Sequence, residues 1–297
     1  MIDLSIIIVS FNTKDLLQEC LLSIAKYKIQ DTKYEVIVVD NASSDGSAEM
    51  VKKEFKDAVL VANSENVGFT KANNQAIKKA KGRYVLFLNS DTVVYENTLE
   101  RLVGFMDETK DAGVATARVE LVNGKLDDSC HRGFPTPWRS LCHFSGLSKT
   151  FPKSKLFSGY SLSYLDLSTT HEIDSCSGAC MIVRREAGEE ISWWDEDFFW
   201  YGDDLDFCYR LKEKNWKVYF VPDVKILHYK GASGGIKKIS QHLTSATKET
   251  RIRATNARFD AMRKFYKKHY MDTYSPIVTW MVLTGINLKH KLTLQAL

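Results

Sequence analysis

Leu4-Ser-Ile-Ile-Ile-Val-Ser10 is a continuous apolar run of mainly β-branched residues, which is typical of a strand buried on both faces of a sheet. Tyr34-Glu-Val-Ile-Val-Val-Asp40 has the same character and predicts a second buried strand. Between them, Asn12 and Thr13 precede a helical apolar stripe made of Leu16, Leu17, Cys20, Leu21 and Ile24. This strand–helix–strand order predicts a βαβ unit with parallel strands.

The alternation continues to about residue 120. Further strands are predicted at 58–62, 83–88 and 113–117, and further helices from Ser44, at 68–80 and at 97–108. We therefore expect an α/β fold with a mostly parallel central sheet flanked by helices. Residues 123–170 hold three of the five prolines and little periodicity, which predicts a long loop region or a small insertion. A strand at 173–184, a helix at 203–215 and a strand at 217–221 are expected to follow.

The composition is that of a globular protein with an uneven distribution of charge. The chain has 297 residues, of which 44% are apolar and 26% charged, and these values exclude a disordered or fibrous protein. The net charge of +4 conceals two different parts. Residues 237–297 carry twelve Lys and Arg against three Asp and Glu, whereas residues 1–236 carry 29 against 34. A mildly acidic body is thus joined to a basic C-terminal region.

The sequence shows no export signal. Met1-Ile2-Asp3 has no basic n-region, and no stretch reaches the roughly 20 apolar residues that span a bilayer. We therefore expect a cytoplasmic protein whose six cysteines are free thiols. Cys176 and Cys180 have a spacing that metal ligands can have, but no second Cys or His pair accompanies them, so buried thiols are the simpler interpretation.

Polar side chains follow three of the predicted strands at their carboxyl ends. Ser10-Phe-Asn12 follows the first strand, Asp40-Asn-Ala-Ser-Ser-Asp-Gly-Ser47 the second, and Asn89-Ser-Asp91 the strand at 83–88. Ligands of open parallel α/β sheets bind at this edge, so three ends of similar chemistry predict a nucleotide pocket. Each end alone is better explained by a turn or a helix cap. A dinucleotide site is not expected, because no Gly-x-Gly-x-x-Gly follows the first strand.

Asp91 and His228 are candidate metal ligands. Asp91 is a carboxylate directly after a buried strand, and hard oxygen ligands suit Mg²⁺ or Mn²⁺. The alternative for Asp91 is a helix cap, although Asp91 lies six positions before the helix at 97–108. His228 either completes the metal site or has a structural role. The glycine-rich stretch after it, with Lys230 and Ser233, could hold a phosphate group.

Residues 193–206 combine six acidic and six aromatic residues. Aromatic rings beside carboxylates exclude water and raise the carboxylate pKa, which suits a general base near neutral pH, and aromatic faces also stack on sugar rings. Asp203, Asp204 and Asp206 fall in the first turn of the predicted helix, where acidic residues complement the helix dipole. This alternative accounts for any one of the three acids, but not for the whole cluster.

Taken together, these motifs resemble those of the inverting family 2 glycosyltransferases, which have the GT-A fold. The matching segments occur in the order of the family between about residues 4 and 235, and they are residues 5–12, 39–46, 66–74, 88–91, 177–184 and 195–210, and His228. The subgroup that the chain resembles most is that of the rhamnosyltransferase-like enzymes of bacterial cell-surface polysaccharide synthesis.

The resemblance implies a nucleotide-sugar site and a metal site. Asp40 would contact the base, and Asn66, Gly68 and Asn73 would shape the floor near the ribose and diphosphate. The whole nucleotide-sugar site would comprise Ser10, Phe11, Asn12, Asp40, Asn41, Asn66, Gly68, Asn73, Asn89 and Ser90. Asp91 would be the metal ligand left from an Asp-x-Asp motif, whose first position is Asn89 here. His228 would be the second ligand of Mn²⁺ or Mg²⁺.

The resemblance also implies catalytic residues. Asp204 would be the general base, as the second acid of the acidic pair of the family. Asp203 stands where Glu is more usual, so the two acids could share this role. The sugar and acceptor pocket would include Gly178, Ala179, Trp200 and Tyr201, and residues 120–175 and 193–201 would set the acceptor and the linkage.

The implied function is metal-dependent, inverting transfer from a nucleoside-diphosphate sugar to a saccharide or lipid-linked acceptor. By subgroup, dTDP-rhamnose is the first expected donor. One alternative is a UDP-hexose-using transferase of the same family. Another is a catalytically inactive carbohydrate-binding protein, against which Asp91, Asp204 and His228 argue. A nucleotidyltransferase would share the fold, but its glycine-rich, basic signature after the first strand is absent.

The basic C-terminal region forms the second of two predicted parts, a GT-A domain at 1–235 and a helical region at 236–297. Residues 240–270 predict a helix whose apolar stripe comprises Ile252, Phe259, Met262, Tyr266 and Tyr270, and an apolar segment with Trp280 follows Pro276. These helices either lie on the anionic inner face of the cell membrane or pack on the catalytic domain, and a homodimer through them is a further alternative. Nucleic acid is not an expected partner, because no recognised binding module accompanies the charge.

Overall fold

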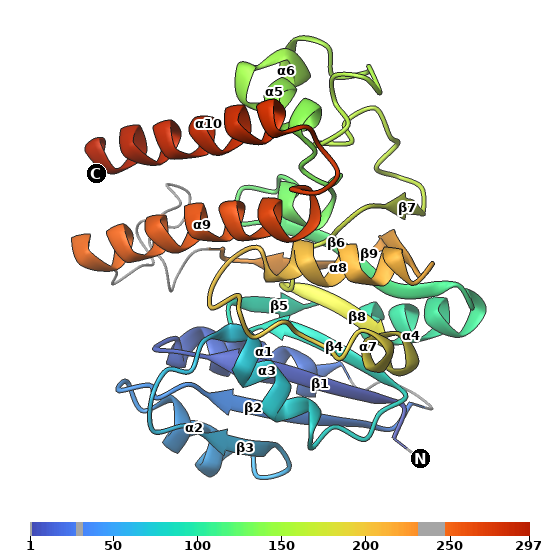
Figure 1. The fold of residues 1–297 in the computed structure, drawn as a ribbon. Helices are drawn as coiled ribbons and strands as arrows, with labels where there is room; N and C mark the ends of the chain where they lie inside the picture. Colours follow the sequence, from blue (N-terminus) through green and yellow to red (C-terminus); the bar gives the residue numbers. More distant parts are fainter. Residues whose placement is uncertain (1, 28–31, 231–246) are drawn as a thin grey trace.

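A nine-stranded sheet runs through the computed structural model, which describes residues 2–27, 32–230 and 247–297 (Figure 1). The strands are β1 (Leu4–Ser10), β2 (Tyr34–Asp40), β3 (Val59–Ala62), β4 (Tyr84–Asn89), β5 (Thr92–Val94), β6 (Ala112–Leu121), β7 (His171–Ile173), β8 (Cys180–Arg184) and β9 (Lys217–His228). They lie in the order β3-β2-β1-β4-β8-β6-β9-β5, and β7 pairs with β9 beside this path. The helices are α1 (Lys14–Lys26), α2 (Ser47–Glu54), α3 (Phe69–Ile77), α4 (Thr98–Glu108), α5 (Pro137–Ser145), α6 (Leu147–Thr150), α7 (Arg185–Glu190), α8 (Asp203–Glu213), α9 (Lys248–His269) and α10 (Pro276–Gln295).

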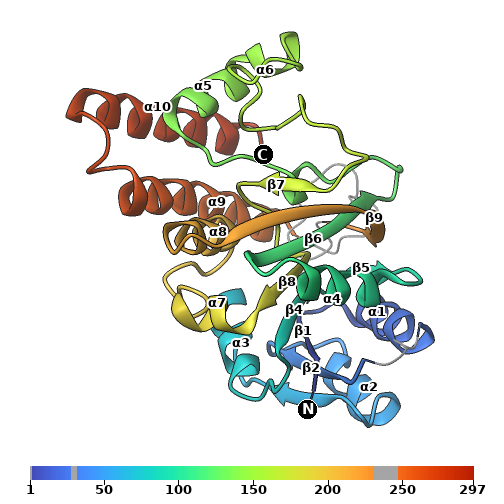
Figure 2. The same cartoon turned by 90° about the vertical axis from the view of Figure 1, so that its right-hand side faces the viewer.

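The first half of the sheet is parallel, as predicted. β3, β2, β1 and β4 pair in parallel, and α1, α2 and α3 connect them in turn. Helices α1, α2 and α4 cover one face of the sheet, whereas α3 and α7 cover the other (Figure 2). Strands covered on both faces must be apolar throughout, and Ile6, Ile7 and Phe87 are at most 1% exposed.

The second half makes the sheet mixed, where a mostly parallel sheet was expected. β8 is antiparallel to both of its neighbours, β4 and β6, and β5 and β7 are antiparallel to β9. The single strand predicted at 173–184 is two strands. The first, β7, pairs with β9, and the chain then leaves the sheet and returns as β8 between β4 and β6. On the way, Ser175 pairs with Arg132. The last predicted strand is also longer than expected, since β9 continues from Val221 to His228.

The segment at 123–170 contains more regular structure than its sequence indicates. It holds a short 3₁₀ helix at Asp128–Cys130 and the helices α5 and α6. Helix α5 begins after Thr136, whose side-chain oxygen accepts a hydrogen bond from the Arg139 backbone N–H, and it ends before Gly146, which has φ 85°. These helices span only nine and four residues, which is too short for a helical period to stand out in the sequence.

Helix α9 packs on α8 and on Phe198, which precedes α8. The predicted start of this helix at Ser240 lies outside the described residues, and the helix is observed from Lys248 to His269. Three of its five predicted stripe residues, Phe259, Tyr266 and Tyr270, are at most 5% exposed. Helix α10 follows and runs beside α9, with none of its residues buried (Figure 1). Among the helices of the described residues, none is both long and apolar enough to cross a membrane.

All six cysteines are free thiols and buried, as the sequence analysis expected. They lie in the described part of the chain, and each is accommodated in the interior as a small apolar side chain.

Candidate active site

The carboxyl ends of β1, β2 and β4 lie side by side, because β1 pairs with both other strands. In this register Ser10 stands opposite Asp40. The Ser10 hydroxyl lies 3.0 Å from the Thr13 hydroxyl, which in turn lies 2.9 Å from the Ser90 hydroxyl. A buried chain of hydroxyl groups therefore joins the ends of β1 and β4 and holds the two turns that follow them.

Asp40 ends β2, and its two carboxylate oxygens have different surroundings. Its side chain is 3% exposed, and its Oδ2 accepts a hydrogen bond from the Ser43 backbone N–H at 3.0 Å. Its Oδ1 is buried and has no hydrogen-bond partner within the described residues. Leaving a buried acceptor unsatisfied costs about 1–3 kcal/mol. A ligand N–H, such as that of a base imide, would satisfy this oxygen, which agrees with the role predicted for Asp40.

Asn12 connects the ends of β1 and β2. Its backbone has φ 53°, its N–H donates to Ser43 Oγ at 2.9 Å, and its Oδ1 accepts from the Ser44 N–H at 2.8 Å. The side chain of Asn12 thus braces the two turns. Its neighbour Phe11 is 38% exposed and presents an apolar ring at the same edge.

Asn41, Asn66 and Gly68 form a braced loop before α3. Asn41 Nδ2 donates to Asn66 Oδ1 at 2.9 Å and to the Gly68 carbonyl at 3.3 Å. Gly68 has φ 88°, and a Cβ there would lie 2.7 Å from Phe199 Cδ2, so no larger residue fits. Asn73 is 1% exposed and donates to the first carbonyl of α3 at 2.9 Å. These amides are used in protein contacts, and their contact with a nucleotide remains a prediction.

Asn89, Asp91 and His228 come together across the β5–β9 pair. His228 Nε2 lies 3.2 Å from Asp91 Oδ1 and 3.5 Å from Asn89 Nδ2. Asp91 is 7% exposed and His228 is 5% exposed. The structure therefore brings together the two residues that the sequence analysis proposed as metal ligands. The glycine-rich stretch after Lys230, proposed there as a phosphate-binding segment, lies outside the described residues.

Asp127 completes this cluster, although the sequence analysis missed it. Its carboxylate is fully buried, and its Oδ2 accepts a hydrogen bond from His228 Nδ1 at 3.0 Å. Its Oδ1 accepts from the Ser129 N–H at 2.9 Å and contacts Lys230 Nζ. No motif marks Asp127 in the sequence, since it lies in the irregular segment at 123–170. The sequence offered Lys230 as one residue that could hold a phosphate group, and in the structure it balances the charge of this carboxylate.

The electrostatics of the cluster favour a charged histidine. Burial acts to lower the pKa of His228, but Asp91 and Asp127 outweigh it and raise this pKa to about 9. Burial also acts to raise the pKa of Asp127, but the hydrogen bond from His228 and the charge of Lys230 hold it well below its usual range. An imidazolium thus balances the two carboxylates in this arrangement.

The same donor set fits a divalent cation. Two atoms bound at about 2.1 Å and at a right angle to each other lie about 3 Å apart, and Asp91 Oδ1 and His228 Nε2 are 3.2 Å apart. If a cation replaced the Nε2 proton, the hydrogen bond from Nδ1 to Asp127 would keep the ring oriented with its Nε2 lone pair facing Asp91. The described residues hold no group of three or more His, Cys, Asp or Glu side chains that could bind a metal ion alone. Phosphate oxygens of a substrate would therefore have to supply the remaining ligands of Mg²⁺ or Mn²⁺.

Asp203 and Asp204 stand in the first turn of α8, where the sequence predicted them. Gly202, with φ 75°, precedes the helix, and Asp204 Oδ1 accepts a hydrogen bond from the Leu205 N–H at 2.8 Å. Asp203 is 8% exposed, and burial together with the charge of Asp204 raises the pKa of Asp203. Asp204 Oδ2 instead lies 2.6 Å from Arg132 Nη2. The two neighbouring acids therefore have different environments.

Arg132 is the second functional candidate that the sequence analysis missed. Its side chain is 12% exposed and reaches Asp204 from the segment at 123–170. Burial acts to lower its pKa, but the charge of Asp204 outweighs this effect and raises the pKa above its usual range. The guanidinium is therefore charged. No spacing rule connects Arg132 with Asp204, so only the tertiary structure shows the contact.

Gly178 and Ala179 form the turn that enters β8 beside the end of β4. The Ala179 carbonyl accepts a hydrogen bond from the Asn89 N–H at 3.2 Å. Trp200 and Tyr201 precede α8, and their rings stack on each other with centroids 5.1 Å apart. Burial raises the pKa of Tyr201 to about 12. The role of these four residues in holding a sugar remains a prediction.

Half of the aromatic residues at 193–206 are core residues. Trp193, Trp194 and Phe198 are at most 8% exposed, and the Trp194 ring lies 4.8 Å from that of Phe87 between ring centroids. These three rings are therefore not available to stack on a sugar, whereas Phe199 is 40% exposed.

Asp206 has a structural role. It is fully buried and accepts hydrogen bonds from Arg210 Nε at 2.7 Å, from Lys268 Nζ at 2.6 Å and from His269 Nε2 at 2.8 Å. Burial acts to raise its pKa, but these donors outweigh it and lower the pKa to about 2. The third acid of the predicted cluster thus connects α8 to α9.

The sheet edge, the contact of Asp91 with His228 and the neighbouring acids Asp203 and Asp204 are the arrangement that the resemblance to a glycosyltransferase implies. In a comparison with protein-family models, residues 5–192 match the model described as Glycosyl transferase family 2. Because the match covers more than half of the chain, the chain belongs to glycosyl transferase family 2. The match ends before α8, so Asp203, Asp204 and His228 lie beyond it.

Two curated relatives of similar extent are rhamnosyltransferases. The chain is 25% identical over 228 residues to the N-acetylglucosaminyl-diphospho-decaprenol L-rhamnosyltransferase of Mycobacterium tuberculosis. The aligned region covers 73% of this chain and 73% of the relative. It is 27% identical over 236 residues to the rhamnosyltransferase WbbL of Escherichia coli. The aligned region covers 75% of this chain and 82% of the relative.

Solved structures confirm the predicted GT-A fold. A mannosyltransferase of Pyrobaculum calidifontis, in complex with GDP-Man and Mn²⁺, matches with a TM-score of 0.59 and 18% identity over 98% of this chain and 72% of that one. TarS of Staphylococcus aureus (residues 1–349), in complex with UDP-GlcNAc, matches with a TM-score of 0.55 and 19% identity over 97% of this chain and 72% of that one.

Proposed function

We propose that this glycosyltransferase moves L-rhamnose from dTDP-rhamnose to a saccharide or lipid-linked acceptor in the synthesis of a cell-surface polysaccharide. The observation that carries the chemistry is the contact of Asp91 with His228 at 3.2 Å, beside the strand ends that hold Asp40. The choice of rhamnose is supported by the two rhamnosyltransferases that match about three quarters of the chain.

In the proposed reaction Asp204 is the general base and the anomeric configuration is inverted. The acceptor hydroxyl attacks the anomeric carbon from the face opposite the nucleoside diphosphate, and the bond from that carbon to the diphosphate breaks. Asp204 takes the proton of the hydroxyl as the new bond forms. Arg132 holds one oxygen of Asp204 and thereby orients the other.

Asp91 and His228 are the residues that would hold Mn²⁺ or Mg²⁺. The cation would supply positive charge for the diphosphate that leaves. Asp127 would keep the His228 ring in place from the other side. We expect EDTA to stop transfer and Mn²⁺ or Mg²⁺ to restore it. Full turnover by thoroughly chelated enzyme would contradict the metal assignment.

The donor is tested with a panel of nucleotide sugars. With Mn²⁺ present, dTDP-rhamnose is expected to raise the melting temperature more than UDP-glucose, UDP-GlcNAc or GDP-mannose. UDP-hexoses are the second candidate, because TarS binds UDP-GlcNAc and shares the fold. A larger shift with a UDP-hexose would replace rhamnose by that sugar. The remaining alternative, an inactive carbohydrate-binding protein, would show no slow hydrolysis of any donor without acceptor.

We also place the enzyme in the cytoplasm, at the inner face of the cell membrane. The basic charge of residues 236–297 and the exposed side chains of α10 support a contact with anionic lipid. A homodimer through α9 and α10 is the competing proposal. Light scattering of the purified chain without lipid distinguishes the two, since the dimer predicts twice the monomer mass.

A further inference from the structure

Helix α10 carries apolar side chains on two opposite faces. On one face it packs on α9, where Thr279 Oγ1 lies 3.1 Å from the Tyr266 hydroxyl and the His290 ring stacks on Phe259 at 4.6 Å between centroids. The opposite face exposes large apolar side chains by at least 53%, and these are Ile277, Trp280, Met281, Leu288 and Leu292. A helix that is apolar all round is normally covered on all sides. Something beyond the described residues is therefore expected to cover the second face.

A second element exposes apolar side chains of the same size. It consists of α5, α6 and the turn that follows them, within the segment at 123–170 that no motif explains. The exposed side chains are each at least 45% accessible, and they are Trp138, Leu141, Phe144, Phe151 and Leu156. Soluble surfaces rarely gather so many large apolar side chains without a binding role.

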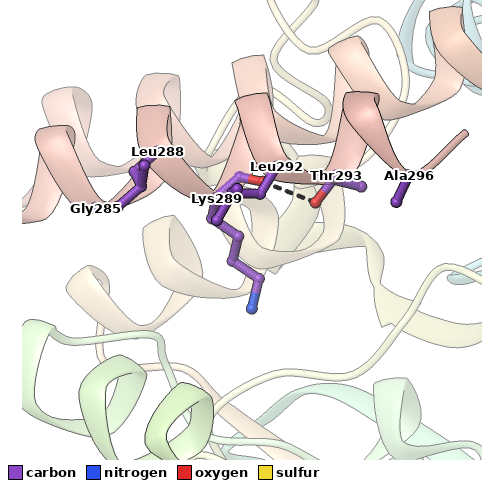
Figure 3. A pocket seen from close by; sticks show the side chains of 6 residues that line it. All are labelled: Gly285, Leu288, Lys289, Leu292, Thr293 and Ala296. Carbon is purple, nitrogen blue, oxygen red and sulfur yellow. Dashed lines mark hydrogen bonds between the residues drawn. The ribbon is translucent and has the colours of Figure 1, made fainter.

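The two elements meet. Lys289 Nζ of α10 lies 3.5 Å from the centroid of the Phe144 ring of α5. Both views show α10, α5 and α6 at the same end of the molecule, away from β2 and β3 (Figures 1 and 2). A shallow groove runs along α10 at this place, with Lys289 extending from the helix (Figure 3), and it is lined by Gly285, Leu288, Lys289, Leu292, Thr293 and Ala296. We name α10, α5, α6 and the turn to Leu156 the docking surface.

The charge of the docking surface indicates which kind of partner it binds. Residues 129–165 contain no Asp or Glu, and neither do residues 273–297. Exposed lysines accompany the apolar side chains in both elements, namely Lys149, Lys153, Lys155, Lys289 and Lys291. Apolar Trp, Phe and Leu side chains can enter the head-group layer of a bilayer, and the neighbouring lysines attract anionic lipid. This combination, without carboxylates, therefore suits an anionic membrane. A second copy of the chain, packed by symmetry on the same surface, would bring lysines against lysines.

We propose that the docking surface lies in the head-group layer of an anionic phospholipid membrane, with α10 and α5 both in contact with lipid. This inference extends the proposed membrane location from the C-terminal region to the segment at 123–170. It also relates that location to the proposed reaction, because Pro137 at the start of α5 lies five residues after Arg132. The lipid contact would thus place the Arg132–Asp204 pair next to the membrane that carries a lipid-linked acceptor.

The test is co-sedimentation of the full chain with vesicles of phosphatidylcholine alone or mixed with phosphatidylglycerol. The chain is expected to bind the mixed vesicles more tightly. Each double variant removes two large apolar side chains from the lipid contact and adds two negative charges, so Leu141→Glu/Phe144→Glu and Trp280→Glu/Met281→Glu should each weaken binding at least about tenfold. Leu22→Glu on α1, where Leu22 is 55% exposed, is the matched control and should bind as the parent chain does.

Two further measurements keep the result interpretable. Lys153→Glu/Lys155→Glu should weaken binding to the mixed vesicles and leave the weak binding to phosphatidylcholine unchanged. Circular dichroism and acceptor-free donor hydrolysis show whether each variant is folded and active. If no nucleotide sugar is hydrolysed by any chain, the proposed function fails, whereas the vesicle results still decide the docking surface.

Either of two outcomes would overturn the inference. If the α5 variant binds vesicles as the parent chain does, the C-terminal region acts alone and the joint surface is wrong. If the parent chain is a dimer without lipid and the same double variants make it monomeric, the surface belongs to a second copy instead.

Discussion

Arg132 Nη2 lies 2.6 Å from Asp204 Oδ2, so the segment between β6 and β7 supplies the partner of an acid in the first turn of α8. The other oxygen of Asp204 accepts a hydrogen bond from the helix backbone, from the Leu205 N–H at 2.8 Å. Both contacts fix the orientation of the carboxylate. A general base gains from such positioning, because proton transfer depends on distance and direction.

Replacing Arg132 by methionine is expected to lower kcat by about 100-fold and to change the KM for the donor by less than about threefold. The physical reason is that Asp204 loses the group that orients it, while Asp40 and Asp91 at the nucleotide edge are untouched. Steady-state kinetics with varied donor measures both constants. Arg132→Lys should recover part of kcat, since it keeps the charge but not the planar fork. Equal loss in the Lys and Met variants, together with a lower melting temperature, would indicate a merely structural role.

Asp204→Asn keeps the size of the side chain and removes the proton acceptor. Transfer is expected to fall by about 10²–10⁴-fold, while nucleotide binding, measured by calorimetric titration, should stay within about threefold because Asp40 and Asp91 remain. Asp203→Asn is the matched comparison. Burial favours the neutral form of Asp203, which Asn imitates, so turnover near neutral pH should fall by less than about tenfold. The opposite ranking of the two variants would assign the base to Asp203.

Asp127→Asn tests the support of the metal site. Asp127 accepts a hydrogen bond from His228 Nδ1 at 3.0 Å, whereas Asp91 faces the other ring nitrogen, Nε2. Losing such a partner typically weakens metal binding 10–100-fold, so the Mn²⁺ concentration for half-maximal activity should rise by about that factor. Asp128→Asn is the control, since this neighbouring carboxylate is exposed. An unchanged Mn²⁺ requirement in Asp127→Asn would contradict the positioning role.

The parts of the fold that the sequence predicts are those set by neighbouring residues. β1, β2 and β4 are apolar runs because both faces are covered, and α8 begins at Asp203 because acids favour the first turn of a helix. The direction of β8 could not be predicted in this way. An apolar strand looks the same in either direction, and its place between β4 and β6 depends on pairings far along the chain.

The same division applies to the site. Asp40, Asp91 and Asp204 could be found because they follow strands or open a helix. Asp127 and Arg132 could not, since Asp127 meets His228 across 101 residues and lies in a segment without periodicity. Contacts of this kind are encoded by the whole fold, and a local pattern of residue types does not reveal them.

Asp206 should make the stability of the protein depend on acid pH. Its pKa is lowered from 3.8 to about 2 in the folded protein, so its contribution is complete above about pH 4 and is lost as the pH falls toward 2. Lowering this pKa from 3.8 to about 2 corresponds to about 2–3 kcal/mol of folding free energy. Asp206→Asn is therefore expected to lower the free energy of unfolding in urea by about that amount at pH 7, and by clearly less at pH 3. Asp272→Asn, at an exposed carboxylate, serves as the control. An equal loss at both pH values would show that the charge of Asp206 is not responsible.

Two truncations separate the roles of the C-terminal helices. Deleting residues 272–297 removes α10 but leaves Phe259 and Phe265 of α9 and the following Tyr270 in place, and each of these is at most 5% exposed. This variant should stay folded, bind donor nucleotide within about threefold of the parent chain, and lose most of its vesicle binding. Deleting residues 247–297 also removes Lys268 and His269, which leaves the buried Asp206 with fewer partners, so unfolding should occur at much lower urea concentration. Urea titration and vesicle co-sedimentation of both variants check these outcomes. If the shorter deletion already unfolds the protein, α10 is required for the core beneath α9, which would favour packing on the rest of the chain as the role of this helix.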